Sequence, residues 1–194
     1  MPVPQGVWQD ISLDFIDGLP LSDSKNVILV VVDRFTKFAH FIPLKHPYTA
    51  QHVASVFLDR VASIYELPKT MVSDRDAIFT SQFWKVLFAK MKVPLLISTT
   101  YHPQTDGQTE RVNQCLEMYL RCATSVSPTK WCSWLPLAQY WYNTTYYSSL
   151  NCTPYKALFG MDPRYAFLPD KLPDATPMDD TGVQSLLEDR QLFS

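Results

Sequence analysis

The stretch NVILVVVD, residues Asn26–Asp33, holds six consecutive apolar side chains between two polar residues. A strand that is apolar at every position is typical of the interior of a sheet that helices cover on both faces. The five valine and isoleucine residues in the stretch also suit a strand, because β-branched side chains fit a pleated surface. The stretch therefore predicts a buried strand of an α/β fold.

Two further strands flank this stretch in the sequence. Ile11–Ile16 begins with apolar and polar residues in alternation, which places Ser12 and Asp14 on one face of a strand and the apolar residues on the other. Phe38–Pro43 follows the central stretch after a short turn. The short connections between these strands favour antiparallel pairing.

Helices and strands alternate in the next part of the chain. Apolar residues at helical spacing from Val53 to Ile64 predict a helix that Thr49 can cap. A longer helix is predicted at about Gly107–Ala123, with Thr105 or Asp106 as its N-cap. The other predicted elements are strands at Thr70–Ser73 and Pro94–Ser98, a helix capped by Ser81, a polar loop at Tyr101–Gly107 and an aromatic helix around Leu135–Tyr147. The order of all these elements predicts a five-stranded mixed sheet flanked by helices.

The 194 residues are enough for one domain, which we expect at residues 1–165. Residues 166–194 are rich in proline and acidic side chains and predict a tail or linker. The longest apolar run has six residues, far short of the roughly 20 that span a bilayer, so no membrane partner is expected. The net charge of −2 permits a nucleic-acid partner without indicating one.

Three carboxylates stand where packing does not require them. Asp14 lies inside a predicted strand, Asp74 ends another, and Glu110 lies in the first turn of the long predicted helix. If these carboxylates converge at one end of the sheet, divalent cations would offset their mutual repulsion, because Mg²⁺ prefers oxygen ligands. Each also has an ordinary interpretation, as a solvated strand residue, a turn former and a first-turn helix acid respectively. Competing candidates for the same roles are Asp33, Asp76 and Asp106.

Three longer motifs carry a family resemblance. WQDISLDFI at Trp8–Ile16, VSDRDAIFTS at Val72–Ser81 and STTYHPQTDGQTERVNQ at Ser98–Gln114 resemble the integrase catalytic core of gypsy-like long-terminal-repeat retrotransposons, in the retroviral integrase superfamily. The resemblance continues through the shorter segments Trp134-Leu135-Pro136, Tyr142-Asn143-Thr144 and Thr153-Pro154-Tyr155, so that it covers about residues 6–165.

The resemblance implies an RNase H-like fold and a catalytic, metal-binding triad of Asp14, Asp74 and Glu110. In the family pattern 35 residues separate the second and third acids, and 35 residues lie between Asp74 and Glu110, whereas Asp76 would leave 33. The implied reaction is phosphoryl transfer on DNA with two Mg²⁺ or Mn²⁺ ions per active site, first processing the 3′ end and then joining element DNA to target DNA. No zinc site is expected, because the histidines and cysteines lack the arrangement of the zinc module in complete integrases.

The resemblance also implies partners and DNA contacts. Double-stranded DNA, a homodimer or higher oligomer, and a nuclear location follow from the family. The residues expected to contact DNA are His102, Gln104 and Gly107 in the loop and Arg111, Asn113 and Gln114 on the helix, although a solvated helix face is an alternative for Asn113. Two other functions stay open: a catalytically silent interaction module derived from a retroelement, and an RNase H-type nuclease on the same fold.

Overall fold

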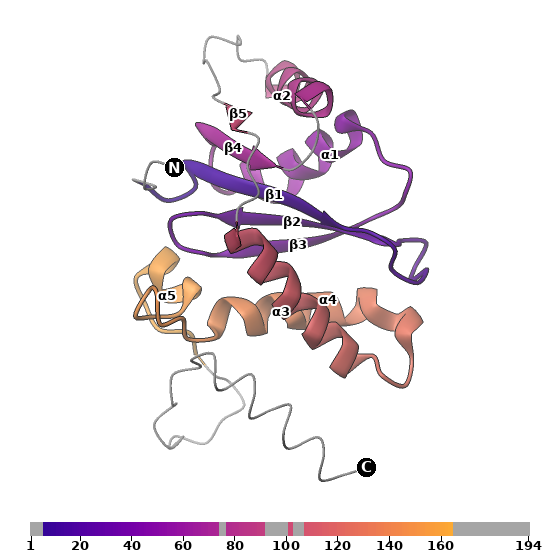
Figure 1. The fold of residues 1–194 in the computed structure, drawn as a ribbon. Coiled ribbons are helices and arrows are strands. Elements are labelled where there is room, and N and C mark those ends of the chain that lie inside the picture. The colour runs from indigo at the N-terminus through magenta and orange to yellow at the C-terminus, as the bar shows by residue number, and fades with distance from the viewer. Residues whose placement is uncertain (1–5, 74–76, 92–100, 103–106, 165–194) are drawn as a thin grey trace.

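The computed structural model describes residues 6–73, 77–91, 101–102 and 107–164. Its strands are β1 (Asp10–Ile16), β2 (Val27–Asp33), β3 (Ala39–Leu44), β4 (Thr70–Ser73) and β5 (Tyr101–His102). Its helices are α1 (Ala50–Phe57), α2 (Ala77–Met91), α3 (Gly107–Ala123), α4 (Trp131–Thr144) and α5 (Pro154–Phe159), with a π-helical turn at Leu58–Ala62 and a 3-10 turn at Pro128–Lys130 (Figure 1).

The strands form one mixed sheet in the order β3-β2-β1-β4-β5. β1 lies in the middle, antiparallel to β2 and parallel to β4, as the predicted mixed α/β fold requires. Strands β1 to β4 make up most of the sheet, and β5 adds two residues beside β4. The predicted strand at Pro94–Ser98 lies outside the described residues. β5 instead occupies the start of the segment predicted as a loop, because its backbone pairs with Met71 and Val72 of β4.

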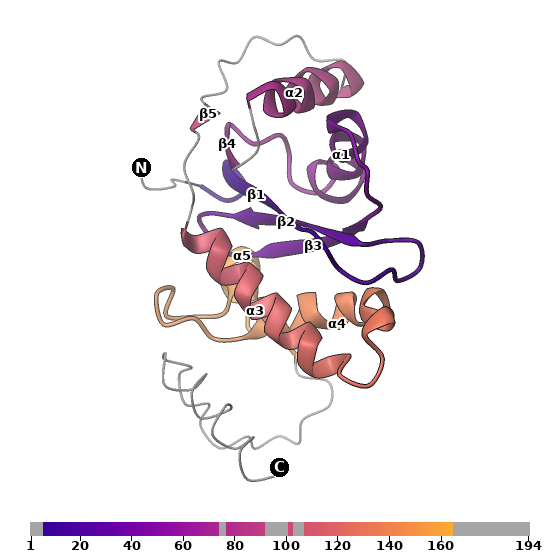
Figure 2. The ribbon, with the colours of Figure 1, turned by 45° about the vertical axis from the view of Figure 1, so that its right-hand side comes forward.

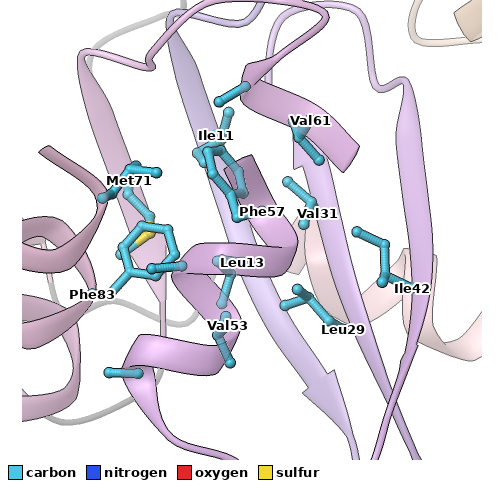
Figure 3. Close-up of a cluster of buried hydrophobic side chains, with 14 of the residues drawn as sticks. Ile11, Leu13, Leu29, Val31, Ile42, Val53, Phe57, Val61, Met71 and Phe83 are labelled. Carbon is cyan, nitrogen blue, oxygen red and sulfur yellow. The ribbon is translucent and has the colours of Figure 1, made fainter. Parts of the chain in front are cut away.

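Helices cover both faces of the sheet (Figures 1 and 2). One face packs against α1 and α2, and Figure 3 shows Leu13 and Val31 of the sheet beside Phe57 of α1. The opposite face packs against α3 and α4, where Val30 shares a cluster with Leu116 and Leu135. All seven residues of β2 are buried, so the double-sided burial predicted for this strand is confirmed.

Three predicted helix boundaries are shifted. α1 ends at Phe57 and continues as a π-helical turn, which leaves Ile64 64% exposed because the residues beyond the turn no longer follow the 3.6-residue period. α2 begins at Ala77, four residues before the predicted cap, and Ser81 is an exposed residue inside it. α4 covers Trp131–Thr144, earlier than predicted, because a 3-10 turn leads into it and Thr145 is extended.

Side chains of α4 protect the outer edge of β3. The Asn143 side chain accepts a hydrogen bond from the Ala39 N–H and donates one to the Ala39 carbonyl, both at 2.8 Å. The Gln139 Oε1 accepts from the Phe41 N–H at 2.8 Å. The next outward-facing residue is Pro43, which has no N–H. The amide side chains thus take the place of a neighbouring strand and occupy backbone groups to which another chain could otherwise pair.

The cysteines Cys115, Cys122, Cys132 and Cys152 are free thiols. In the described part of the chain, no helix has the length and apolar character needed to cross a bilayer.

Candidate active site on β1 and α3

Asp14 lies on the central strand, on the face that α3 covers. It is opposite Val30 of β2 and is half-buried. One carboxylate oxygen, Oδ1, accepts a hydrogen bond from the backbone N–H of Phe15 at 2.8 Å. The other, Oδ2, accepts from the side-chain Nδ2 of Asn113 at 2.6 Å. Both carboxylate oxygens are therefore oriented by donors of the protein.

The bond from Asn113 connects the beginning of α3 to the middle of the sheet. Glu110 lies in the first turn of α3, three residues before Asn113, and its side chain is exposed. Residues three apart on a helix are neighbours on its surface. Asn113 thus brings the turn that carries Glu110 close to Asp14, although 95 residues separate the two acids in the sequence.

The third predicted acid, Asp74, lies outside the described residues. β4 ends at Ser73, the residue before Asp74, and Ser73 is opposite Leu13, the residue before Asp14. Within the described ranges, no three His, Cys, Asp or Glu side chains are grouped so that they could hold a metal ion. The predicted triad therefore stays a prediction as a set of three.

Buried oxygen atoms without partners gather on the same two elements. Among the described residues, the side-chain oxygens of Ser12, Thr109 and Asn113 are buried and have no hydrogen-bond partner. Ser12 shares a strand face with Asp14, while Thr109 and Asn113 are four residues apart on α3. A buried polar atom without a partner costs free energy in an ordinary core. β1 and α3, the two elements that carry Asp14 and Glu110, therefore each hold buried oxygen atoms without partners among the described residues.

Asp33, one of the competing acids, has a structural role at the end of β2. It is fully buried, and its carboxylate accepts hydrogen bonds from the backbone of Phe35 and Thr36 and from the Thr36 hydroxyl, the last at 2.6 Å. Burial raises the pKa of Asp33, although these bonds act in the opposite direction. Asp33 therefore shapes the turn between β2 and β3. The other two competitors, Asp76 and Asp106, lie outside the described residues.

The residues that were expected to contact DNA differ in their exposure and in their partners in the structure. Arg111 and Gln114 are exposed on α3, whereas Asn113 is half-buried against Asp14 instead of belonging to a solvated face. The contact between Asn113 and Asp14 was not predicted, because it depends on how α3 packs on the sheet. The remaining candidates are Gly107, which begins α3, His102, whose backbone belongs to β5, and Gln104, which lies outside the described residues.

Curated proteins related to this chain are retrotransposon polyproteins. Over 188 residues, which is 97% of the chain, the sequence is 38% identical to the Transposon Tf2-3 polyprotein of Schizosaccharomyces pombe, and the match to the Transposon Tf2-4 polyprotein has the same identity and length. The chain spans 14% of the length of each of these polyproteins. No protein-family model matches the chain.

Solved structures with a similar fold are retroviral integrases. A chain of the simian T-cell lymphotropic virus intasome, solved in complex with the PP2A regulatory subunit B56 gamma, has a TM-score of 0.64 at 20% identity and covers 90% of this chain and 63% of its own length. The HTLV-2 integrase catalytic core domain, solved with magnesium in a dimeric form, has a TM-score of 0.59 at 18% identity and covers 78% of this chain and 97% of its own.

The two kinds of comparison agree with the motifs in the sequence. The identity to the Tf2 polyproteins extends over almost the whole chain, and the structural likeness extends over most of it. The chain is therefore similar in sequence to a part of the Tf2 retrotransposon polyproteins, and its fold is similar to that of the retroviral integrase catalytic cores.

Proposed function

We propose that this chain is the catalytic core of a retrotransposon integrase, a polynucleotidyl transferase that processes the 3′ ends of element DNA and joins them to target DNA. The observation that carries the proposal is the hydrogen bond from Asn113 to Asp14, which brings the turn bearing Glu110 onto the central strand. The sequence similarity to the Tf2 polyproteins and the fold that the chain shares with retroviral integrase cores support it.

The residues of the site suit a divalent metal ion. Carboxylates of Asp14, Asp74 and Glu110 would hold it, and the unpartnered oxygens of Ser12 and Asn113 add to a neighbourhood rich in oxygen. Mg²⁺ prefers such hard oxygen ligands, and Mn²⁺ accepts them as well. A related fold, the HTLV-2 core, was solved with magnesium. When bound, two such ions would supply Lewis-acid stabilisation of the charge that develops on the phosphoryl oxygens.

In this mechanism the main task of the protein is to position the catalytic carboxylates and the reacting groups. The Phe15 N–H and the Asn113 amide fix the two oxygens of Asp14, so that the carboxylate keeps one orientation during the reaction. Phosphoryl transfer requires little covalent participation by the protein, and catalysis depends on aligning the attacking and leaving oxygens. Asn113 is therefore a positioning residue, while Asp14, Asp74 and Glu110 are the proposed catalytic residues.

Double-stranded DNA is the proposed partner, and a dimer or higher oligomer the proposed state. A retroviral relative of this fold was solved within an intasome, and HTLV-2 cores were solved in dimeric and trimeric forms. A nuclear location follows if DNA in the nucleus is the target.

The decisive experiment is a strand-transfer assay with Mg²⁺ or Mn²⁺ on labelled DNA ends. We expect Glu110→Gln to abolish product formation, because the variant removes one ligand charge at nearly constant size. Glu117→Gln is the matched control, since this exposed acid lies seven residues further along the same helix. Undiminished strand transfer by Glu110→Gln would overturn the assignment.

Two further measurements distinguish the proposed transferase from an RNase H-type nuclease and from a silent interaction module. Cleavage of an RNA–DNA hybrid by the wild-type chain, without strand transfer, would favour an RNase H-type nuclease. Mg²⁺ should raise the melting temperature of the wild type and not that of Asp74→Asn, because ligand binding stabilises the native state. Inactivity together with no shift in the wild type would favour the silent interaction module.

A further inference from the structure

A second feature of the α3 face is a cavity of about 420 Å³ beside the candidate active site. It lies between the turn that follows β2, the first turn of α3 and the segment after α4. Val32 and Val112 provide apolar lining, and Lys37 and Arg111 bring two positive charges. Of the described residues that line it, none is acidic. A cavity of this composition attracts an anion.

Lys37 is held in place by the turn around Asp33. The Lys37 N–H donates to the Asp33 carbonyl at 2.8 Å, and the Lys37 Nζ donates to the Arg34 carbonyl at 2.7 Å. The backbone of Lys37 is in the left-handed region, with φ of 63°. The buried Asp33 carboxylate fixes the preceding residues through its bonds to Thr36. Because the turn is fixed in this way, Lys37 is positioned before any ligand binds, which reduces the entropy lost on binding.

Arg111 connects the cavity with the proposed chemistry. It follows Glu110 directly near the start of α3, and Val32, another lining residue, is opposite Ser12 of β1, so the cavity lies at the same end of α3 as the candidate active site. A guanidinium group can donate two parallel hydrogen bonds to a phosphate, and the positive end of the helix dipole at this turn adds to the attraction.

Hydroxyl groups complete the wall of the cavity. Tyr142 and Tyr147 are hydrogen-bonded to each other, with ring centroids 5.4 Å apart. Burial raises the pKa of both phenols, so both stay neutral and add no negative charge. Ser149 contributes an exposed hydroxyl. Two positive charges and the Ser149 hydroxyl thus line the same space, and the Tyr142–Tyr147 pair closes its wall.

We propose that the cavity between Lys37 and Arg111 binds a phosphate group of the DNA backbone, on the strand next to the reacting phosphodiester. The inference rests on the proposed function for the identity of the ligand, since a free phosphate has the same chemistry. It assigns Lys37, Tyr147 and Ser149 to a site that the family motifs do not include. The site would hold DNA without reading its sequence, because phosphate contacts position a duplex and base contacts specify it.

The test is DNA binding measured by fluorescence anisotropy in EDTA, so that the proposed metal site does not contribute. The variant is Lys37→Gln with Arg111→Gln, which removes both charges and leaves polar side chains at both positions. The control is Arg60→Gln with Lys130→Gln, which removes the same charges from exposed positions that do not line the cavity. Thermal melting establishes that both double variants are folded.

We expect the cavity variant to bind duplexes of unrelated sequence about tenfold more weakly than the wild type, and the control to bind as the wild type does. The slope of log affinity against log salt concentration should become shallower by about 1. Unchanged affinity and slope in the cavity variant would overturn the inference. If inorganic phosphate shifts the Ser149 amide resonance in a nuclear magnetic resonance titration but DNA binding is unchanged in the variant, the ligand is free phosphate and the assignment to DNA is wrong.

The outcomes distinguish this inference from the proposed function. A chain that binds DNA through the cavity but performs no strand transfer keeps the inference and overturns the proposed activity. A chain that performs strand transfer while the cavity variant binds DNA normally overturns the inference alone.

Discussion

The two faces of the sheet are built for different purposes. The face beneath α1 and α2 packs one apolar cluster in which Leu13, Val31 and Phe57 are buried. The face beneath α3 and α4 also has an apolar cluster, but here Asp14 and Asn113 meet beside it. The same strand, β1, contributes to both faces, because alternate residues point to opposite sides. One strand can therefore anchor the fold and present a carboxylate without conflict between the two tasks.

The comparison predicts that the largest loss of stability comes from the apolar face. Phe57→Ala should lower the free energy of unfolding by about 3–5 kcal/mol, because it leaves a cavity between α1 and the sheet. Urea denaturation measures this loss. The control is Leu137→Ala on α4, which is 49% exposed and should change stability by no more than about 0.5 kcal/mol. Equal effects of the two substitutions would contradict the assignment of the core.

The next largest effect is expected where α4 protects the edge of β3. Asn143→Leu removes two hydrogen bonds and leaves the Ala39 N–H and carbonyl without partners, so we expect a loss of about 2–4 kcal/mol. Gln139→Leu removes one bond, to Phe41, and should cost less. Denaturation of both variants gives the order, and light scattering should show self-association of Asn143→Leu through the uncovered edge. A larger loss for Gln139→Leu would contradict this interpretation of the edge.

On the α3 face we expect a smaller loss of stability than for Phe57→Ala and Asn143→Leu. This loss of stability should be accompanied by a loss of function. Asn113→Ala removes the donor to Asp14 and should cost about 1–2 kcal/mol. If Asn113 positions the carboxylate, the variant should also need more Mg²⁺ for half-maximal strand transfer. Glu117→Ala, at an exposed position on the same helix, is the control and should change neither quantity. An Asn113→Ala enzyme with an unchanged metal requirement would leave Asn113 with a structural role alone.

The smallest expected effect is on how stability depends on pH. It comes from His40 on the apolar face, which packs among Trp8, Phe38 and Tyr65. Burial lowers the pKa of His40 from 6.5 to about 4, so the unfolded chain takes up its proton first as the pH falls. The histidine therefore reduces stability progressively from about pH 6.5 down to about pH 4. His40→Phe should flatten the stability profile in this range, as measured by denaturation at several pH values.

The control for this pH experiment is His52→Gln, at an exposed position on α1. It should leave the slope of stability against pH as it is in the wild type. The same slope in His40→Phe would show that His40 does not titrate in the predicted way.

Much of the fold follows from local patterns in the sequence. The alternation in β1 places Asp14 opposite the apolar face, and the apolar run in β2 predicts burial on both sides, as observed. α3 has the predicted bounds, and Thr49 caps α1 by accepting a hydrogen bond from the His52 N–H. These features depend on backbone periodicity and short-range hydrogen bonds, which a few neighbouring residues specify.

Other features were decided by the tertiary structure. Asn113 contacts Asp14 across 99 residues, and Asn143 contacts Ala39 across 104. Asp33, a candidate ligand in the sequence, proves to be the acceptor that shapes a turn. No local pattern could separate these roles, because an exposed, a capping and a metal-binding carboxylate can share one sequence context.

The sequence by itself therefore determined the resemblance to retrotransposon integrase cores, the types of element and the acids available for chemistry. The tertiary structure decided which polar groups meet: Asn113 with Asp14, and Lys37 with Arg111 around one cavity. The physical reason lies in the range of the interactions. Periodicity is a property of one segment, whereas a contact between distant side chains depends on strand register and on the way helices pack against the sheet.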